Sequence, residues 1–145
     1  MSIRPIIQAP DPRLLQPSAP VGLFMPISGL VGDLISTRLE AGAAGLSAVQ
    51  IGVHLRIVAV HPKEFFGFKI LVNPEIVARS DEMVTTEEGC MSIGNGVPRF
   101  SVRRHKFVQV HFLDRKGEAH DFRAEGFAAR LVQHEIDHLD GKLIA

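Results

Sequence analysis

The feature that most constrains this chain is a five-residue motif near its C-terminal end, His134-Glu135-Ile136-Asp137-His138, which reads H-E-x-x-H. If the motif is helical, His134 and His138 lie one above the other on one face. Two imidazoles placed in this way can both point at one metal ion. Glu135 follows His134 by about 100° of helix rotation, so it can reach a metal-bound water without being a ligand. The motif therefore indicates a metal site with an adjacent general base.

The residues before the motif predict which way its helix faces. Phe127, Leu131 and the two histidines follow one another at steps of three or four, which is typical of a face turned to the interior. The alternative is a surface helix with two ordinary histidines. Two inward histidines need a partner, and a metal ion is a suitable one. We therefore predict a metal-binding helix over 126–139, capped near Gly141.

Composition narrows the class of protein. The chain has 145 residues, a formal net charge of zero and one cysteine. These values predict a single domain over 1–145, no nucleic-acid partner and no internal disulfide. No apolar run reaches the roughly 18 residues of a membrane span, and the first residues are unlike a secretory signal. We expect a cytoplasmic protein with no membrane partner.

The rest of the chain predicts an α+β fold. Largely antiparallel β-sheets are expected to pack around the C-terminal helix that carries the motif, with a second helix near the N-terminus. The proline-rich residues 1–24 are expected to wrap over this body. The expected elements are an amphipathic helix over 27–41 with a stripe reaching Leu39, strands over 55–60, 68–72, 100–103, 106–113 and 119–124, a loop over 61–67, a turn at Asn73-Pro74, and a hairpin of 75–80 with 82–87.

Cys90 is a candidate third ligand. It lies in the segment Glu88-Gly89-Cys90-Met91-Ser92, between two strand regions. A lone cysteine is more often a small buried hydrophobe, but this position suits a ligand at a loop edge. Two imidazoles and one thiolate leave a fourth tetrahedral position open, which is typical of a catalytic zinc site. The pKa of a water held there would fall towards roughly 7, and Glu135 would take its proton.

The small-residue segment 43–52 contains one uncharged polar residue, Gln50. Small side chains permit close approach to the backbone, although a tight core loop in which Gln50 bonds backbone groups explains the pattern equally well. A tetrahedral intermediate needs hydrogen-bond donors for its oxyanion. The side-chain amide of Gln50 and the backbone N–H of Met91 are the candidates.

Three motifs together give a resemblance to a known family. Residues 43–50 are similar to G-x-G-x-A-A-x-Q, residues 88–92 match E-G-C-x-S, and residues 134–138 match H-E-x-D-H. Over nearly its whole length the chain resembles peptide deformylases, and residues 7–14 resemble the N-terminal segment of that family. The resemblance implies a divergent member with a short C-terminus. It implies a metal-dependent amide hydrolase that removes the N-terminal formyl group from formyl-methionyl nascent polypeptides.

The resemblance also implies roles for single residues. Cys90, His134 and His138 map onto the ligands of one divalent ion, Glu135 onto the catalytic acid/base, and Gln50 with the Met91 amide onto the oxyanion site. Ferrous iron is the expected ion in the cell, and zinc or nickel can replace it, whereas spacing alone predicts zinc. The residues expected at the substrate are Ala44, Gly45, Leu46, Thr86, Glu88, Gly89, Phe127, Arg130 and Leu131. The expected partners are N-formyl-methionyl peptides, nascent chains and the ribosome exit region. The enzyme is expected to be a monomer.

Departures from the motifs concern the first segment most. Ala43 stands in place of a glycine, Ala44 in place of a larger aliphatic residue near the methionine pocket, and Ser47 in place of an alanine. If the glycine position needs a positive φ, Ala43 strains the loop. We also expect Glu88 to pair with Arg99 beside the cysteine.

Three other functions remain open at this point. The first is a degenerate deformylase-like paralogue that binds metal or N-terminal peptides with little turnover. The second is a zinc peptidase, because H-E-x-x-H is shared, although no downstream ligand is evident. The third is a structural zinc module, which normally fills all four positions with protein ligands.

Overall fold

The computed structural model describes residues 1–63 and 67–145. Its long elements are α1 (Ser28–Ala41), β1 (Gly45–Ser47), β2 (Ile57–Val60), β3 (Lys69–Arg79), β4 (Met83–Glu88), β5 (Phe100–His105), β6 (Phe107–Leu113), β7 (Ala119–Glu125) and α2 (Gly126–Leu139). Three short 3-10 helices are η1 (Pro12–Leu15), η2 (Ala48–Ile51) and η3 (Gly94–Gly96). The loop predicted over 61–67 lies partly outside the described residues.

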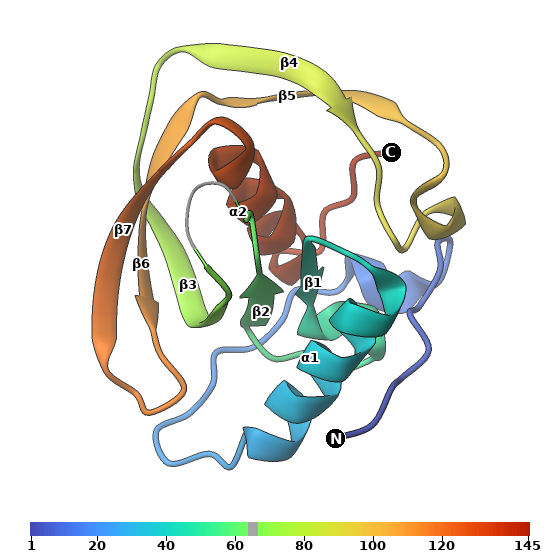
Figure 1. Cartoon of the computed structure of the whole chain (residues 1–145), viewed down its shortest axis with the longest axis vertical. Helices are drawn as coiled ribbons and strands as arrows, with labels where there is room; N and C mark the ends of the chain where they lie inside the picture. The colour runs from blue at the N-terminus through green and yellow to red at the C-terminus, as the bar shows by residue number, and fades with distance from the viewer. Residues whose placement is uncertain (64–66) are drawn as a thin grey trace.

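The strands form two antiparallel sheets. The larger has the order β1-β2-β3-β6-β7, and β4 pairs with β5 in a separate two-stranded sheet. Helix α2 lies inside the curve of the larger sheet and below the β4–β5 pair, while α1 lies against β1 and β2 (Figure 1). This arrangement confirms the predicted α+β fold, with antiparallel sheets packed around the C-terminal helix.

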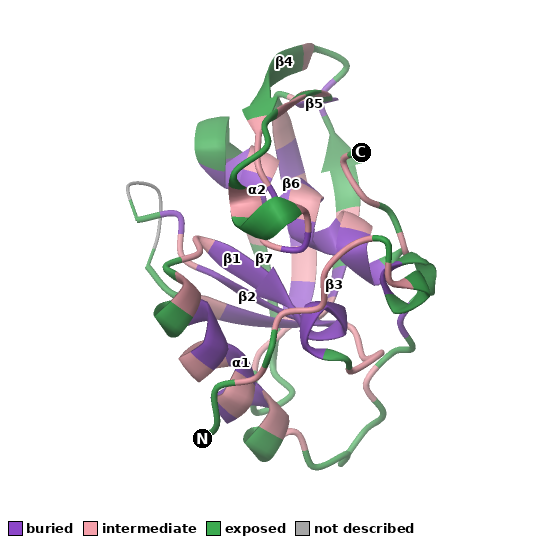
Figure 2. Cartoon of the chain, turned by 90° about the vertical axis from the view of Figure 1, so that its right-hand side faces the viewer, coloured by how far each residue is buried: buried purple, intermediate pink, exposed green. Residues whose placement is uncertain are grey.

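Strand β2 separates two hydrophobic cores. Val58 and Val60 point towards α2, whereas Ile57 and Ala59 point towards α1, because successive side chains of a strand point to opposite faces. All four residues are fully buried, and the strand is purple throughout in Figure 2. The α2 core also contains Leu71, Val108, Val110, Ala128, Val132 and Leu139, and the α1 core also contains Val31, Leu34, Leu46, Ala48 and Ile70.

Helix α1 begins one residue later than predicted and ends as expected. Val31 and Leu34 of the predicted stripe are fully buried, but Leu39 is 62% exposed, so its inclusion in the stripe is wrong. Gly42 follows the helix with a φ of 67°, and its N–H donates to the carbonyl of Leu39. A glycine in this left-handed conformation ends a helix without steric cost.

The turn at Asn73-Pro74 and the following hairpin were wrongly predicted. Strand β3 continues through both residues to Arg79, with a register shift between Val72 and Glu75. The Asn73 side chain accepts a hydrogen bond from the Val21 N–H (2.8 Å) and donates to the Val21 carbonyl (3.1 Å). A bulge stabilised in this way bends a strand without ending it. β3 then pairs with β6, so β4 is free to pair with β5.

The proline-rich N-terminal segment wraps over the body as predicted. Its backbone N–H groups donate to distant carbonyls, among them Ile7 to Gln50 (2.8 Å), Ala9 to Ser92 (2.7 Å) and Ser18 to Leu139 (2.8 Å). The segment therefore contacts η2 at Gln50, the loop after Cys90 at Ser92, and the C-terminal end of α2 at Leu139.

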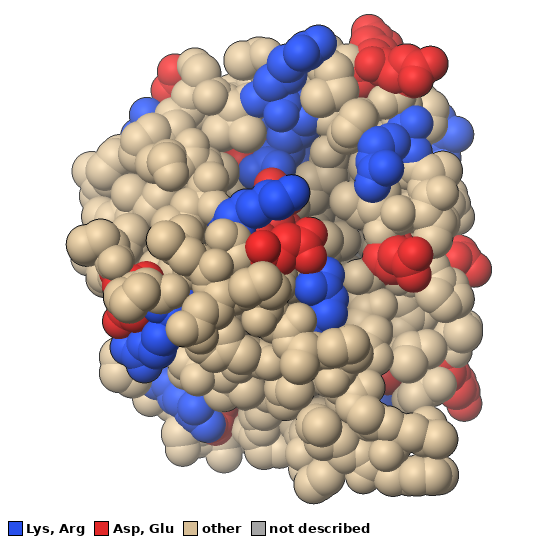
Figure 3. Space-filling view, turned by 180° about the vertical axis from the view of Figure 1, so that it is seen from behind, with Lys and Arg blue, Asp and Glu red and all other residues tan. Residues whose placement is uncertain are grey.

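Charged side chains of both signs are interspersed on the surface shown in Figure 3. This distribution agrees with a formal net charge of zero. No helix within residues 1–63 and 67–145 is long and apolar enough to cross a membrane.

Candidate active site

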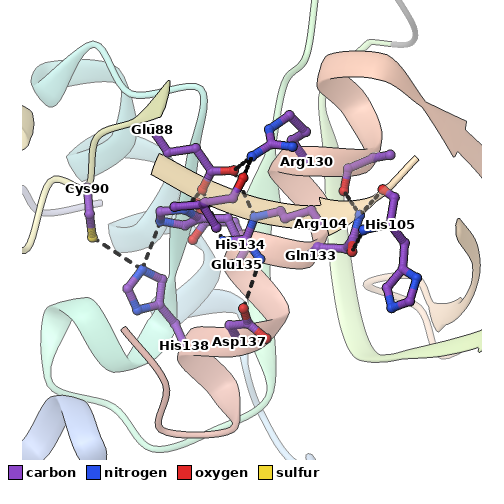
Figure 4. A network of polar contacts seen from close by, with 12 residues as sticks. Glu88, Cys90, Arg104, His105, Arg130, Gln133, His134, Glu135, Asp137 and His138 are labelled. Carbon is purple, nitrogen blue, oxygen red and sulfur yellow. Dashed lines mark hydrogen bonds and ion pairs between the residues drawn. The ribbon is translucent and has the colours of Figure 1, made fainter. Parts of the chain in front are cut away.

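The two motif histidines and Cys90 converge at one point (Figure 4). Cys90 Sγ lies 3.4 Å from His138 Nε2, and this nitrogen lies 3.2 Å from His134 Nε2. The three ligand atoms all lie within 4.8 Å of one another. Helix α2 places the two imidazoles one turn apart, and the loop after β4 supplies the sulfur. The structure therefore brings together the three residues that the sequence analysis predicts as metal ligands.

This donor set fits a metal ion. In a tetrahedral site with bonds of about 2.0–2.3 Å, neighbouring ligand atoms are about 3.3–3.7 Å apart. The distances of 3.2 and 3.4 Å are close to that range. No fourth side chain joins the group within the described part of the chain. Three protein ligands leave a coordination position open, as in catalytic rather than structural zinc sites.

Glu88 sets the orientation of the first histidine. Its Oε1 lies 3.0 Å from His134 Nδ1, and its Oε2 accepts from Arg104 (2.8 Å) and pairs with Arg130 (2.7 Å). A proton held on Nδ1 leaves Nε2 free to bind an ion. Burial alone would raise the pKa of Glu88, but hydrogen bonds from His134 and Arg104 outweigh it and lower the pKa to about 2.

The predicted pair of Glu88 with Arg99 is wrong. Arg99 donates instead to the backbone carbonyl of Glu87, at 3.1 Å, and lines the cavity described below. Arg104 takes the predicted place, because it projects from β5 towards α2 and is only 5% exposed.

Arg104 was missed by sequence reasoning. It also donates to Asp137 Oδ2 at 2.9 Å, so it connects Glu88, near the cysteine loop, to helix α2. Burial lowers the pKa of Arg104, but its bonds to Glu88 and Asp137 outweigh this effect and raise it. The aspartate in H-E-x-D-H was a signal for such a partner, although the sequence did not indicate which arginine would supply it.

The surroundings of the two histidines differ. Burial lowers the pKa of His138 to about 3, which favours a neutral ring with a free lone pair. Burial also lowers the pKa of His134, but Cys90 and Glu88 outweigh it and raise the pKa to about 10. Anionic neighbours that favour a proton on a ring also favour a metal cation bound to it. The charge around His134 is thus suited to a cation.

Glu135 is buried beside the ligands, 3% exposed. Its Oε1 accepts a hydrogen bond from Ser47 Oγ at 2.9 Å. Burial raises the pKa of Glu135, against the opposing effects of His134 and Ser47. A Cβ atom on Gly45 would lie 2.8 Å from Oε2, so only glycine lets β1 approach the carboxylate this closely. A carboxyl group with a raised pKa is suited to accept and return a proton.

Gln50 lies in the short helix η2 with its amide held at both ends. Its Oε1 accepts from the Ser47 N–H (2.9 Å), and its Nε2 donates to Ser92 Oγ (3.0 Å). An amide nitrogen carries two hydrogens, so one remains for another acceptor. Gln50 and Met91 both border the same cavity as Glu135. Gln50 thus makes the backbone contact of a tight core loop and also faces the candidate site.

A cavity of about 290 Å³ opens beside these residues. Eight of the nine predicted substrate residues line it: Ala44, Gly45, Thr86, Glu88, Gly89, Phe127, Arg130 and Leu131. Leu46 does not, because it is fully buried in the core against α1. Phe127 is 50% exposed and therefore does not lie on an interior face as predicted. Sequence reasoning missed Ala43, Glu87, Gly96 and Arg99, which also line the cavity.

The expected strain at Ala43 is absent. The described non-glycine residues with a positive φ are Phe24, Lys63, Asn73 and Asn95, so Ala43 has an ordinary conformation. Its carbonyl accepts a hydrogen bond from Arg38 Nη1 at 2.9 Å. The replacement of a glycine at this position therefore carries no backbone cost.

Comparison with known proteins identifies the family. Residues 3–145 match the family described as polypeptide deformylase. The chain belongs to this family. It is 39% identical to peptide deformylase 1 of Rickettsia conorii and 40% identical to the peptide deformylase of Rickettsia prowazekii, and each match covers 99% of this chain and 86% of the relative.

Solved structures of the family have the same fold. The Ehrlichia chaffeensis peptide deformylase superposes with a TM-score of 0.92 at 35% identity, covering 99% of this chain and 86% of that one. The actinonin-bound class I type b peptide deformylase of Acinetobacter baumannii gives a TM-score of 0.90 at 33% identity, covering 99% and 97%. Peptide deformylases are metal-dependent hydrolases of protein biosynthesis, and this chain is an enzyme of that kind.

Proposed function

We propose that this enzyme removes the N-terminal formyl group from formyl-methionyl peptides and nascent chains, and that one domain, 1–145, carries the whole site. The observation that carries the proposal is the convergence of three metal-ligating atoms beside a buried carboxylate, at the wall of one cavity. Membership of the polypeptide deformylase family supports the reaction class. The alternative of a paralogue with little turnover is not favoured by these comparisons.

Cys90, His134 and His138 would hold the ion. When bound, a divalent ion acts as a Lewis acid and lowers the pKa of a water molecule to roughly 7, which supplies the nucleophile. Ferrous iron is the ion that the family resemblance implies, with zinc and nickel as substitutes. Glu88 would keep His134 in the tautomer that a ligand needs.

Glu135 would move the proton. It takes a proton from the attacking water as the bond to the formyl carbon forms, and returns it to the amine nitrogen as the carbon–nitrogen bond breaks. The products are formate and a peptide with a free amino terminus. Burial supports this role because it raises the pKa of Glu135, and the hydrogen bond from Ser47 supports it because it holds the carboxyl group in place.

Gln50 and Met91 would stabilise the oxyanion that develops during attack. The free hydrogen of Gln50 Nε2 and the backbone N–H of Met91 are the donors proposed. Gln50 is suited to the role because bonds to Ser47 and Ser92 fix its amide before substrate arrives. A donor fixed in advance costs no reorganisation during the reaction.

The apolar part of the cavity would take the methionine side chain. Ala44, Phe127 and Leu131 line it, and a structure of the Acinetobacter baumannii relative contains bound Met-Ala-Ser. Arg130 is held by Glu88 and by backbone carbonyls of Val84 and Val102, so it would shape the pocket wall. Action on nascent chains near the ribosome exit, as a cytoplasmic monomer, belongs to the same proposal.

Formate release tests the proposal. The purified protein is loaded anaerobically with one equivalent of ferrous iron, nickel or zinc and given N-formyl-Met-Ala-Ser. We expect formate and free Met-Ala-Ser in equal amounts, with no cleavage of the peptide bonds. Cleavage of Met-Ala-Ser itself would indicate a peptidase, and a loaded protein that releases no formate would overturn the proposal.

A further inference from the structure

Ser47 contacts the proposed acid/base directly. It is the last residue of β1 and is fully buried. Its Oγ lies 2.9 Å from Glu135 Oε1 and 2.8 Å from the backbone carbonyl oxygen of Glu135. A hydroxyl has one hydrogen, so it donates to one of these oxygens at a time. Both acceptors belong to the same residue, and Ser47 therefore remains against Glu135 in either orientation.

The two carboxylate oxygens of Glu135 have different surroundings. Oε1 receives the Ser47 hydroxyl, whereas Oε2 lies beside Gly45, and both Gly45 and Glu135 line the cavity. A glutamate side chain has several rotatable bonds, and holding one oxygen removes much of that freedom. The contact thus leaves Oε2 as the oxygen available to a reacting water.

Ser47 also holds the proposed oxyanion donor. Its backbone N–H donates to Gln50 Oε1 at 2.9 Å, which directs the amide nitrogen of Gln50 towards Ser92 and the cavity. Any residue except proline can supply this backbone bond, whereas the bond to Glu135 needs a side-chain donor such as the Ser47 hydroxyl. The motif that residues 43–50 resemble has alanine here, so the hydroxyl contact is a feature of this chain's own sequence.

We propose that Ser47 is a positioning residue for the reaction: its hydroxyl holds one carboxylate oxygen of Glu135 so that the other faces the substrate. This inference rests on the proposed function. It predicts a loss of turnover without a loss of substrate binding, because Ser47 does not line the cavity.

Two substitutions at Ser47 test the role. Ser47→Ala removes the hydroxyl and keeps the backbone bond to Gln50, and Ser47→Cys keeps the shape of the side chain, slightly larger, with a much weaker donor. Each should lower kcat about tenfold, the effect of one hydrogen bond to a charged group, while KM for N-formyl-Met-Ala-Ser changes less than about twofold. Metal content should stay at wild-type level. Ser80→Ala is the matched control, because it loses buried hydrogen bonds away from the cavity and should leave kcat unchanged.

Unchanged kcat in both Ser47 variants would overturn the inference, as would a parallel fall in metal content. A second measurement does not depend on activity. Equilibrium unfolding of Ser47→Ala, Glu135→Ala and the double variant should show a coupling of about tenfold in the folding equilibrium constant. Coupling near zero would overturn the proposed contact. A wild-type protein that releases no formate would refute the proposed function, and the unfolding cycle would still decide whether Ser47 holds Glu135.

Discussion

The two faces of the five-stranded sheet are built differently. On one face, α1 covers the sheet with aliphatic side chains such as Val31 and Leu34, which are fully buried. On the other, α2 also buries Glu135, His138 and Arg104. Glu135 accepts a hydrogen bond from Ser47, Arg104 donates to Glu88, and His138 Nε2 lies 3.4 Å from Cys90 Sγ, whereas His138 Nδ1 is buried without a partner among the described residues. Buried charges need such partners because unpaired ones are costly. The α1 face therefore contributes mainly apolar burial, whereas the α2 face also contains the buried polar residues of the candidate active site.

Glu135→Ala should have the largest effect on turnover while leaving the fold and the metal site in place. We expect kcat to fall by about 10⁴-fold, at the upper end for a general acid–base group, because both proton transfers are lost. Metal analysis should still find one ion per chain, since the proposed ligands are Cys90, His134 and His138. Glu125→Ala, an exposed change just before α2, serves as control and should keep full activity. Loss of the ion from Glu135→Ala would show that Glu135 is a ligand.

Gln50→Ala comes next in size. Removal of one oxyanion donor should lower kcat by about 10²–10³-fold with little change in KM. Steady-state kinetics on N-formyl-Met-Ala-Ser measure both constants. The Gln109→Ala variant, on β6, should match wild type. A change confined to KM would mean that Gln50 binds substrate and does not stabilise the transition state.

Glu88→Gln tests whether metal affinity depends on a residue that contacts a ligand but not the ion. Loss of the negative charge behind His134 should weaken metal affinity by about 10–100-fold. Competition with a chelator measures this affinity. Glu87→Gln is the matched control, because the described hydrogen bonds and ion pairs of His134 involve Glu88 and not Glu87. The metal affinity of this control should be unchanged. Equal affinities in the two variants would remove Glu88 from the metal site.

Ala44→Ile tests the cavity wall. A larger side chain should narrow the pocket and sharpen the preference for formyl-methionine over bulkier formyl-peptides by about 1–3 kcal/mol in transition-state free energy. The ratio of kcat/KM values for the two substrates is the measurement. Ala43→Gly, at the neighbouring position without backbone strain, should leave the ratio unchanged. An unchanged ratio in Ala44→Ile would place the methionine side chain elsewhere.

Leu34→Ala should have the smallest effect on chemistry. It creates a cavity in the α1 core and should lower the free energy of unfolding by about 2–5 kcal/mol. Turnover per folded molecule should remain at wild-type level, because no cavity-lining residue belongs to this core cluster. Denaturant titration and kcat at low temperature measure the two quantities. A large loss of kcat in the folded variant would contradict the division between the faces.

Local spacing explains what the sequence predicted well. The 126–139 helix and the meeting of His134 with His138 follow from residues a few positions apart, and their geometry needed no knowledge of the rest of the chain. The prediction for Cys90 depended on its position in a loop between two strand regions and on the family resemblance, because a lone cysteine is more often a small buried hydrophobe.

Errors arose where distant segments decide the structure. The continuation of β3 through Asn73 depends on Val21, 52 residues away along the chain, which satisfies the amide that a turn would otherwise use. Arg104, and not Arg99, pairs with Glu88 because Arg104 lies in β5 and projects towards α2, whereas Arg99 precedes this strand. Sequence patterns do not contain such long-range relations, and they could not assign Ser47 to Glu135 for the same reason.

Anomalous X-ray diffraction from the ion-loaded protein, recorded at the absorption edge of the added metal, tests the central claim most directly. We predict a single strong peak about 2.0–2.3 Å from Cys90 Sγ and from Nε2 of both His134 and His138. Glu135 should lie outside bonding distance. The same experiment on Cys90→Ala should show a weak peak or none. A wild-type peak that excludes Cys90, or one bonded to Glu135, would contradict the account.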